Sequence, residues 1–196
     1  LGTVSGGNLS LGGATSSIDA LLGGTIALSG NEVLTVSSGS FGGTISGSGS
    51  LVKDGAASLT IGSAQTYNGA TTVRKGLLAF TNTGAVAGGF SLGDALTGAA
   101  DAPTLTFSNG GTIANAFTIG AGASAAFTAT INVTNTSGTT VFTGPFTLSG
   151  GGANYSLALQ VATGGTADFR GVWTVNNGKG FTIGSAGNAG VVKFSN

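Results

Sequence analysis

The chain has 196 residues with 39 Gly, 2 Pro, 40% hydrophobic and only 6% charged residues, a balance that excludes intrinsic disorder and bundles of amphipathic helices. Gly does not recur at every third position, so collagen is excluded as well, and an all-β chain with many tight turns remains. Six Lys and Arg residues balance six Asp and Glu residues, and no basic patch of the kind that nucleic acid or an anionic membrane requires is present.

Residues 47–73 consist of short apolar segments separated by turn residues. Three of these segments each predict a short strand, namely Leu51–Lys53, Leu59–Ile61 and Thr71–Val73. The residues between them accept positive φ at low cost and predict bends at Gly55, Gly62 and Asn68–Gly69. Strands so short and so evenly spaced favour a chain that coils around an axis and stacks on itself.

A four-residue pattern recurs along the chain: an apolar residue, Thr, an apolar residue and a small turn residue. It occurs at Leu59–Gly62, Phe117–Gly120, Phe146–Ser149 and Phe181–Gly184. In a strand the first and third side chains point to one face and Thr to the other, so we expect the apolar pair to fill a solenoid interior. With roughly 20–25 residues per coil, residues 1–196 form one β-solenoid domain of about eight or nine coils, on the order of 40 Å long.

Aromatic residues are predicted to fill this interior. Phe107, Phe117 and Phe127 are evenly spaced, and a solenoid core needs large apolar side chains. Trp173 shares a strand face with Val175, which makes an inward position as well founded as a position in a cleft. If the chain had a binding cleft, Trp173 and Tyr155 would be the residues to line it.

The charged and polar residues predict no catalytic site, no cofactor and no metal. The chain lacks Cys and His, which removes thiolate nucleophiles, zinc-finger ligands and the commonest general base. Asp168 and Arg170 lie two apart on one strand face, where a surface ion pair accounts for them without chemistry. Asp94 and Asp101 are the candidates for calcium ligands, but two carboxylates without a third acidic neighbour do not make such a site.

Residues 47–80 carry a more specific pattern. It consists of Gly47–Gly55 as Gly-x-Gly-x-Leu-x-Lys-x-Gly, then Leu59–Ile61, Thr66–Thr71 and Gly76–Leu78. The stretch resembles the autotransporter-associated β-strand repeat, also called the passenger-associated transport repeat. The rest of the chain matches only in style. The resemblance implies a right-handed parallel β-helix in an exported surface protein, and it implies no catalytic residues.

Both ends of the chain are predicted strands. Leu1 and Val4 lie in the first of them, and Val191, Val192 and Phe194 lie in the last. A solenoid exposes unpaired strand edges at its ends, and these must be capped or paired. We therefore expect copies of the chain to join end to end or to exchange terminal strands, with these five residues in the contact.

The function that these features favour is structural. We expect a β-solenoid subunit or segment of an extracellular bacterial fibre, sheath or surface appendage; the alternative is the passenger region of an adhesin that binds glycans or host surfaces. The chain has no Met, so we expect a processed product or a piece of a longer protein. It has no apolar run long enough to span a bilayer, and we expect no membrane insertion by this segment.

Overall fold

The computed structural model describes residues 2–13, 15–82, 86–149, 154–176, 179–184 and 189–195, where all regular elements are β-strands. The described strands are β1 Thr3–Val4, β2 Asn8–Leu11, β3 Thr15–Leu21, β4 Thr25–Leu28, β5 Val33–Phe41, β6 Thr44–Gly47, β7 Ser50–Asp54, β8 Leu59–Ile61, β9 Thr66–Tyr67, β10 Thr71–Lys75, β11 Leu77–Phe80, β12 Phe90–Asp94, β13 Thr104–Phe107, β14 Gly111–Ile113, β15 Phe117–Ala121, β16 Thr128–Val133, β17 Thr139–Phe142, β18 Phe146–Leu148, β19 Ser156–Val161, β20 Thr166–Phe169, β21 Trp173–Val175, β22 Gly180–Ile183 and β23 Val191–Phe194.

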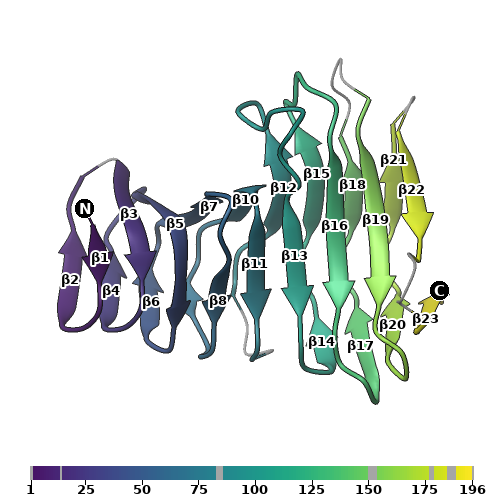
Figure 1. Ribbon diagram of the computed structural model, residues 1–196, viewed down its shortest axis with the longest axis horizontal. Helices are drawn as coiled ribbons and strands as arrows, with labels where there is room; N and C mark the ends of the chain where they lie inside the picture. The colour runs from purple at the N-terminus through teal and green to yellow at the C-terminus, as the bar shows by residue number, and fades with distance from the viewer. Residues whose placement is uncertain are drawn as a thin grey trace.

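These strands wind around one axis in three faces, and every described strand pair is parallel (Figure 1). The first face runs β3, β5, β7, β10, β12, β15, β18, β21, and the second runs β1, β3, β5, β8, β11, β13, β16, β19, β22. They form one 15-stranded sheet because β3 and β5 bend across the corner between them. The predicted parallel β-helix is confirmed.

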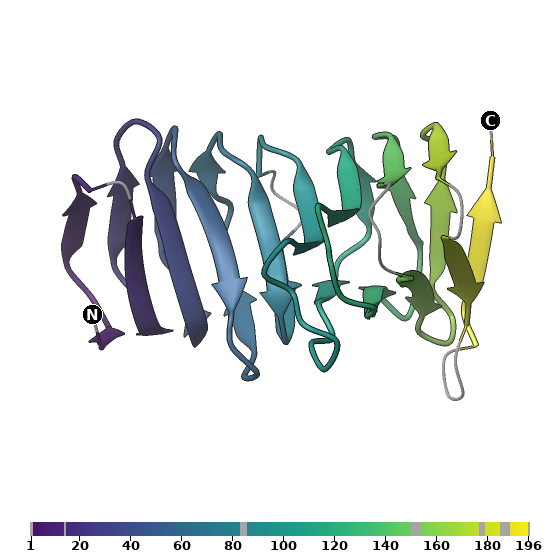
Figure 2. The same cartoon turned by 90° about the horizontal axis from the view of Figure 1, so that it is seen from above.

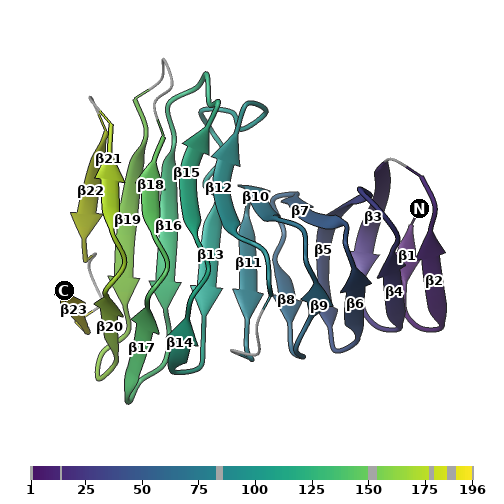
Figure 3. The same cartoon turned by 180° about the vertical axis from the view of Figure 1, so that it is seen from behind.

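The third face consists of two separate sheets, which are seen best from behind (Figure 3). One runs β2, β4, β6, β9 and the other runs β14, β17, β20, β23. The termini lie at opposite ends of the rod (Figure 2). The eight described strands of the first face agree with the expected eight or nine coils.

The coils fall into two length classes. Up to the pairing of β10 with β12, register partners on neighbouring coils are about 17–21 residues apart, as in the pairs Leu34–Leu51 and Leu51–Thr71. From the pairing of β11 with β13 onward they are about 24–29 residues apart, as in the pairs Phe90–Phe117 and Phe117–Phe146. We call the part up to β11 the short-coil region and the part from β12 the long-coil region. The expected coil length of roughly 20–25 residues thus falls between the two classes.

The added length of the long coils lies mainly at the corner between the first and second faces. In a short coil, β10 ends at Lys75 and β11 begins at Leu77, whereas in the next coil β12 ends at Asp94 and β13 begins at Thr104. The longer corners project above the rod at β12 and β15 (Figure 1). Turn and loop residues, rather than longer strands, thus account for much of the change.

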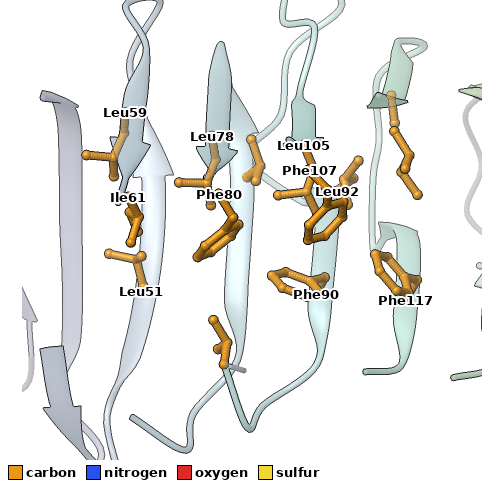
Figure 4. Packing of buried hydrophobic residues seen from close by; sticks show 14 of the residues in the cluster. Leu51, Leu59, Ile61, Leu78, Phe80, Phe90, Leu92, Leu105, Phe107 and Phe117 are labelled. Carbon is orange, nitrogen blue, oxygen red and sulfur yellow. The ribbon is translucent and has the colours of Figure 1, made fainter. Parts of the chain in front are cut away.

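The two regions also differ in what fills the interior. The core of the short coils consists mainly of Leu, Ile and Val with Phe41, Tyr67 and Phe80, whereas Phe recurs in every long coil beside Leu and Ile (Figure 4). Along the first face, the ring centroids of Phe90, Phe117, Phe146 and Trp173 are 5.2, 4.4 and 4.4 Å apart. We call this the first-face aromatic column. Its rings bury large apolar areas and add stacking energy.

A second aromatic column runs along the third face. The rings of Phe142 and Phe169 are 4.6 Å apart, and those of Phe169 and Phe194 are 5.6 Å apart. Phe107 lies in the interior of the β-helix as predicted, and its ring centroid is 5.7 Å from those of Phe90 and Phe142. We call the Phe142–Phe169–Phe194 series the third-face aromatic column.

Phe127 does not join these columns. It is buried in the corner between the first two faces, where it stacks on Tyr155 of the next coil at 5.3 Å. The Tyr155 ring packs directly against the backbone of Gly120, whose φ is +69°. A Cβ at this position would overlap the ring, so only glycine leaves room for it. The long corners therefore have a small aromatic stack of their own.

All three strands predicted within residues 47–73 are confirmed, as parts of β7, β8 and β10. Lys53 is nevertheless fully buried, in register with Val36 and Val73. Its Nζ donates to the carbonyl oxygens of Gly55 at 2.5 Å and Lys75 at 3.1 Å. Burial lowers the pKa of Lys53 to about 8, against a smaller opposing effect of the Asp54 carboxylate.

Candidate assembly surface

The last coil, formed by β21, β22 and β23, closes the described structure at one end of the rod (Figure 1). Each strand pairs on one side only: β21 with β18, β22 with β19 and β23 with β20. No strand in the described part of the chain pairs with their outer edges. Backbone donors and acceptors along these edges are therefore available to a further parallel strand.

Large apolar side chains accompany these edges. The exposed ones, between 43% and 51% accessible, are Val175, Phe181, Ile183, Val191 and Phe194. The partners of four of them one coil earlier are at most 2% accessible, namely Leu148, Leu157, Leu159 and Phe169. The partner of Val191 is Thr166, which is half-buried. We call this surface, together with Trp173, the C-terminal end face. It has the composition of a core layer that lacks its cover.

The predicted assembly residues are distributed over both ends of the rod. Val191 and Phe194 are exposed on the C-terminal end face, and Val192 is half-buried against the core. Val4 lies at the opposite end, half-buried and in register with Leu21. Leu1 lies outside the described residues. The structure thus places Val4 far from the other three.

Sequence reasoning missed part of the C-terminal end face. Trp173, Phe181 and Ile183 belong to it. Trp173, which the sequence left open between a cleft and the core, is half-buried and stacks on Phe146 at 4.4 Å. The recurring pattern at Phe181–Gly184 carried a usable signal. It marks a core strand, because the same pattern lies in the buried strands that begin at Leu59, Phe117 and Phe146.

The N-terminal end is smaller and less apolar. β1 pairs with Ala20 and Leu21 only, and β2 pairs with β4. Val4 and Leu9 are half-buried against the core. This end holds no described aromatic residue.

An ion pair lies beside the C-terminal end face. Arg170 donates from Nε and Nη2 to Asp168 Oδ2 at 2.8 and 2.7 Å, and Ser195 Oγ donates to Asp168 Oδ1. These bonds, led by that of the Ser195 hydroxyl, hold the pKa of Asp168 below its ordinary value. The expected Asp168–Arg170 ion pair is confirmed, but Asp168 is buried and not on the surface as expected. The two charges compensate each other next to the apolar surface.

The two calcium candidates belong to different ion pairs. Asp94 Oδ2 accepts from Arg74 Nε at 2.7 Å, while Asp101 accepts from Lys75 Nζ at 3.1 Å and from the Gly98 amide at 2.8 Å. The Gly98 bond is the main reason that the pKa of Asp101 lies below its ordinary value. Among the described residues, no group of three or more acidic side chains is placed to hold a metal ion.

Tyr155 lies at a shallow hollow beside Phe127, but its ring is buried in the corner stack with that residue. Lys179 covers that ring, with its Nζ 4.5 Å from the centroid. Burial raises the pKa of the Tyr155 hydroxyl. The Tyr155 ring thus contributes to packing in the corner more than it offers a surface to a ligand.

No protein-family model, curated protein or solved structure matches the chain. In the part of the chain that the structure describes, no helix has the length and apolarity needed to cross a bilayer.

Proposed function

We propose that this chain is a structural β-solenoid segment of an extracellular bacterial fibre, sheath or surface appendage, and that it associates with further copies of itself through its ends. The observation that carries the proposal is the C-terminal end face, where three unpaired parallel edges coincide with exposed core-type side chains. Such a surface favours association because it offers backbone hydrogen bonds and apolar area together. In this role the chain needs no catalytic residue and no cofactor.

Charge supports the same proposal. The formal net charge is zero, and the described acidic side chains of Asp54, Asp94, Asp101 and Asp168 are in ion pairs within the chain. Copies therefore approach each other with little long-range repulsion. The proposed extracellular location rests on the resemblance of residues 47–80 to the autotransporter-associated repeat.

Electron microscopy of the purified chain at increasing concentration tests the proposal. We expect rods that lengthen into end-to-end assemblies, with a width that stays that of one solenoid. Analytical ultracentrifugation over the same range should show a rising average mass. Monodisperse short rods at every concentration would contradict self-association and would leave the adhesin alternative, which glycan-binding assays can address.

A charge placed on the C-terminal end face gives the matched test. Phe194→Asp should abolish the assemblies because it puts a carboxylate where core packing is needed. Leu96→Asp is the control, since Leu96 is 71% exposed in the corner loop after β12, on the side of the rod. If Leu96→Asp disrupts assembly as strongly as Phe194→Asp, the contact does not lie at the end.

A further inference from the structure

We infer that a cavity in the wall of the rod, where the short-coil and long-coil regions meet, binds a neutral single-ring aromatic molecule of the phenol type. The cavity has a volume of about 280 Å³. An engineered apolar cavity of roughly 150 Å³ holds a benzene molecule in another protein, so one aromatic ring fits here. The inference goes beyond the proposed function, because a structural role needs no ligand and the C-terminal end face is a different part of the rod.

The cavity lies where the third face is interrupted. β9 is the last strand of one third-face sheet, and β14 is the first strand of the other, two coils later. In the coil between them, the described residues that follow β11 and precede β12, which are 81–82 and 86–89, form no strand. Within the described part of the chain, β14 therefore has no strand neighbour on the side that faces β9.

The cavity takes the place of a side chain in the third-face aromatic column. The rings of that column are in register from β23 back to β17, and their next partner is Ile113 on β14. One coil before Ile113, no strand of the described chain continues the register, and the cavity lies against the Ile113 side chain. Since three later coils each place a ring in this column, a ligand that continues it needs a ring as well.

Three phenylalanine rings line the inner side of the cavity. Phe80, Phe90 and Phe107 point toward one another, with ring centroids 5.7 to 6.1 Å apart (Figure 4). Rings of the third-face aromatic column meet first-face rings edge to face, as Phe142 meets Phe117 at 5.7 Å and 70°. A ligand ring in the cavity can meet Phe90 in the same way, which is an arrangement that aromatic pairs prefer.

The remaining lining favours a neutral ligand. Val86 and Ile113 are buried and extend the apolar wall, and the exposed residues Asn82 and Thr112 lie at the outer side. None of the described residues that line the cavity is charged. Because an unpaired charge in an apolar site is costly, a charged ring compound is disfavoured.

Asn115 supplies a hydrogen-bonding group to this lining. Its Nδ2 donates to the carbonyl oxygens of Val86 at 2.5 Å and Gly88 at 2.6 Å. These two bonds use both amide hydrogens, so the group that Asn115 still offers is its Oδ1, an acceptor. An acceptor beside a ring-sized apolar cavity matches a ring that carries a hydroxyl donor, as phenol does.

Titration of the purified chain with phenol in a calorimeter tests the inference. Phenol is neutral at pH 7, as the phenolic tyrosine side chain is. We expect saturable binding at one site per chain. Benzoate has the same ring with a negative charge, and we expect it to bind at least about tenfold more weakly. Absence of saturable phenol binding would overturn the inference, as would equal binding of benzoate.

Nuclear magnetic resonance of the unaltered chain locates the bound ring. The methyl signals of Val86 and Ile113 should shift as phenol is added, because an aromatic ring changes the magnetic field beside it. The methyl signals of Ile26 and Ile45, which are buried in the short-coil region, should not move. Shifts confined to residues of the C-terminal end face, such as Ile183, would place phenol there and contradict the inference.

Variants that fill the cavity give a second test. Val86→Phe and Ile113→Phe each add a ring from a different part of the lining, and each should weaken phenol binding by about tenfold or more. Leu96→Phe is the control, since it adds a ring at an exposed position in a corner loop and should leave phenol binding unchanged. If both filling variants fold and bind phenol like the unaltered chain, the cavity is not the site. If neither folds, the shifts in the unaltered chain decide.

One further variant separates this inference from the proposed function. Phe194→Asp changes the C-terminal end face and leaves the cavity intact, so it should lose assembly and keep phenol binding. Loss of both would place the phenol site in the assembly contact and refute the cavity as the site. Phenol binding by a chain that never assembles would refute the proposed function alone.

Discussion

The short-coil and long-coil regions share one fold but stabilise it differently. In the short-coil region, β5 passes from the first face to the second in a single strand, and the interior is filled mainly by aliphatic side chains with few rings. In the long-coil region, corner loops separate the two faces and stacked rings fill the interior. The comparison shows that the longer coils, whose added residues lie mainly in corner loops, are also the coils in which aromatic rings stack from one coil to the next.

The largest effect should come from breaking an aromatic column. Phe146→Ala removes a fully buried ring that stacks at 4.4 Å on both Phe117 and Trp173. We expect a loss of about 3–5 kcal/mol in the free energy of unfolding, measured by chemical denaturation. Leu34→Ala is the counterpart in the short-coil region, and we expect about 2–3 kcal/mol there. A larger loss for Leu34→Ala would refute the greater dependence of the long-coil region on single side chains.

The next effect concerns the corner of the short coils. Gly39 has a φ of +144°, and a Cβ at this position would overlap the Leu21 carbonyl oxygen of the coil before. Gly39→Ala should therefore destabilise the chain by about 2–3 kcal/mol in denaturant unfolding. Gly42→Ala is the matched control, since no atom lies within 4 Å of its Cβ and its φ is ordinary. Similar losses for both variants would show that the bend in β5 is not the constraint.

Lys53 should make stability in the short-coil region depend on pH. Its pKa is about 8 when folded, below the ordinary value of 10.5. Between these values the unfolded chain binds more protons than the folded chain, so stability rises as pH increases through this window. The rise should be on the order of 1–3 kcal/mol between pH 7 and about 9.5.

Lys53→Met isolates that contribution, because it retains the apolar stem without the charge. Denaturation of this variant should show a flatter dependence on pH over the same interval. The interval stays below about pH 10 because burial raises the pKa of Tyr67, whose ionisation on unfolding would then lower stability. A wild-type profile that falls between pH 7 and about 9.5 would contradict the assignment.

The sequence predicted the strands well and the coil geometry poorly, for a physical reason. Side chains along a strand point alternately to the interior and to the exterior, so a strand such as Leu59–Ile61 can be recognised from its local sequence. The same alternation does not say which face a strand joins: the look-alike segments at Phe117 and Phe146 stack on the first face, whereas those at Leu59 and Phe181 lie on the second. The number of residues in a coil depends on the length of its loops. Short and long loops contain the same types of residue, so the local sequence does not indicate the loop length.

The buried polar residues of the interior were also not predicted from the sequence. Lys53 lies two residues after Leu51 in β7, so strand alternation places both side chains on the inner face. A buried Lys also requires hydrogen-bond acceptors, and these are the carbonyl oxygens of residues 55 and 75. Such partners are brought together only by the fold. The end-face residues Val191 and Phe194 could be named from the sequence because they need no partner within the chain, whereas recognising their neighbours Phe181 and Trp173 required the register.

The smallest effect lies where the two regions meet. Arg74 of the last short coil bridges Asp54 of the coil before, at 3.5 Å, and Asp94 of the first long coil, at 2.7 Å. Arg74→Gln leaves these two carboxylates without the cation between them, and we expect a loss of about 0.5–1 kcal/mol that shrinks in about 1 M salt. Arg170→Gln is the contrast in the long-coil region: Arg170 contacts Asp168, two positions earlier in the chain, whose side chain is only 7% exposed, and the loss there should be larger and less sensitive to salt. If the loss for Arg74→Gln is unchanged by salt, Arg74 does not hold the short-coil and long-coil regions together electrostatically.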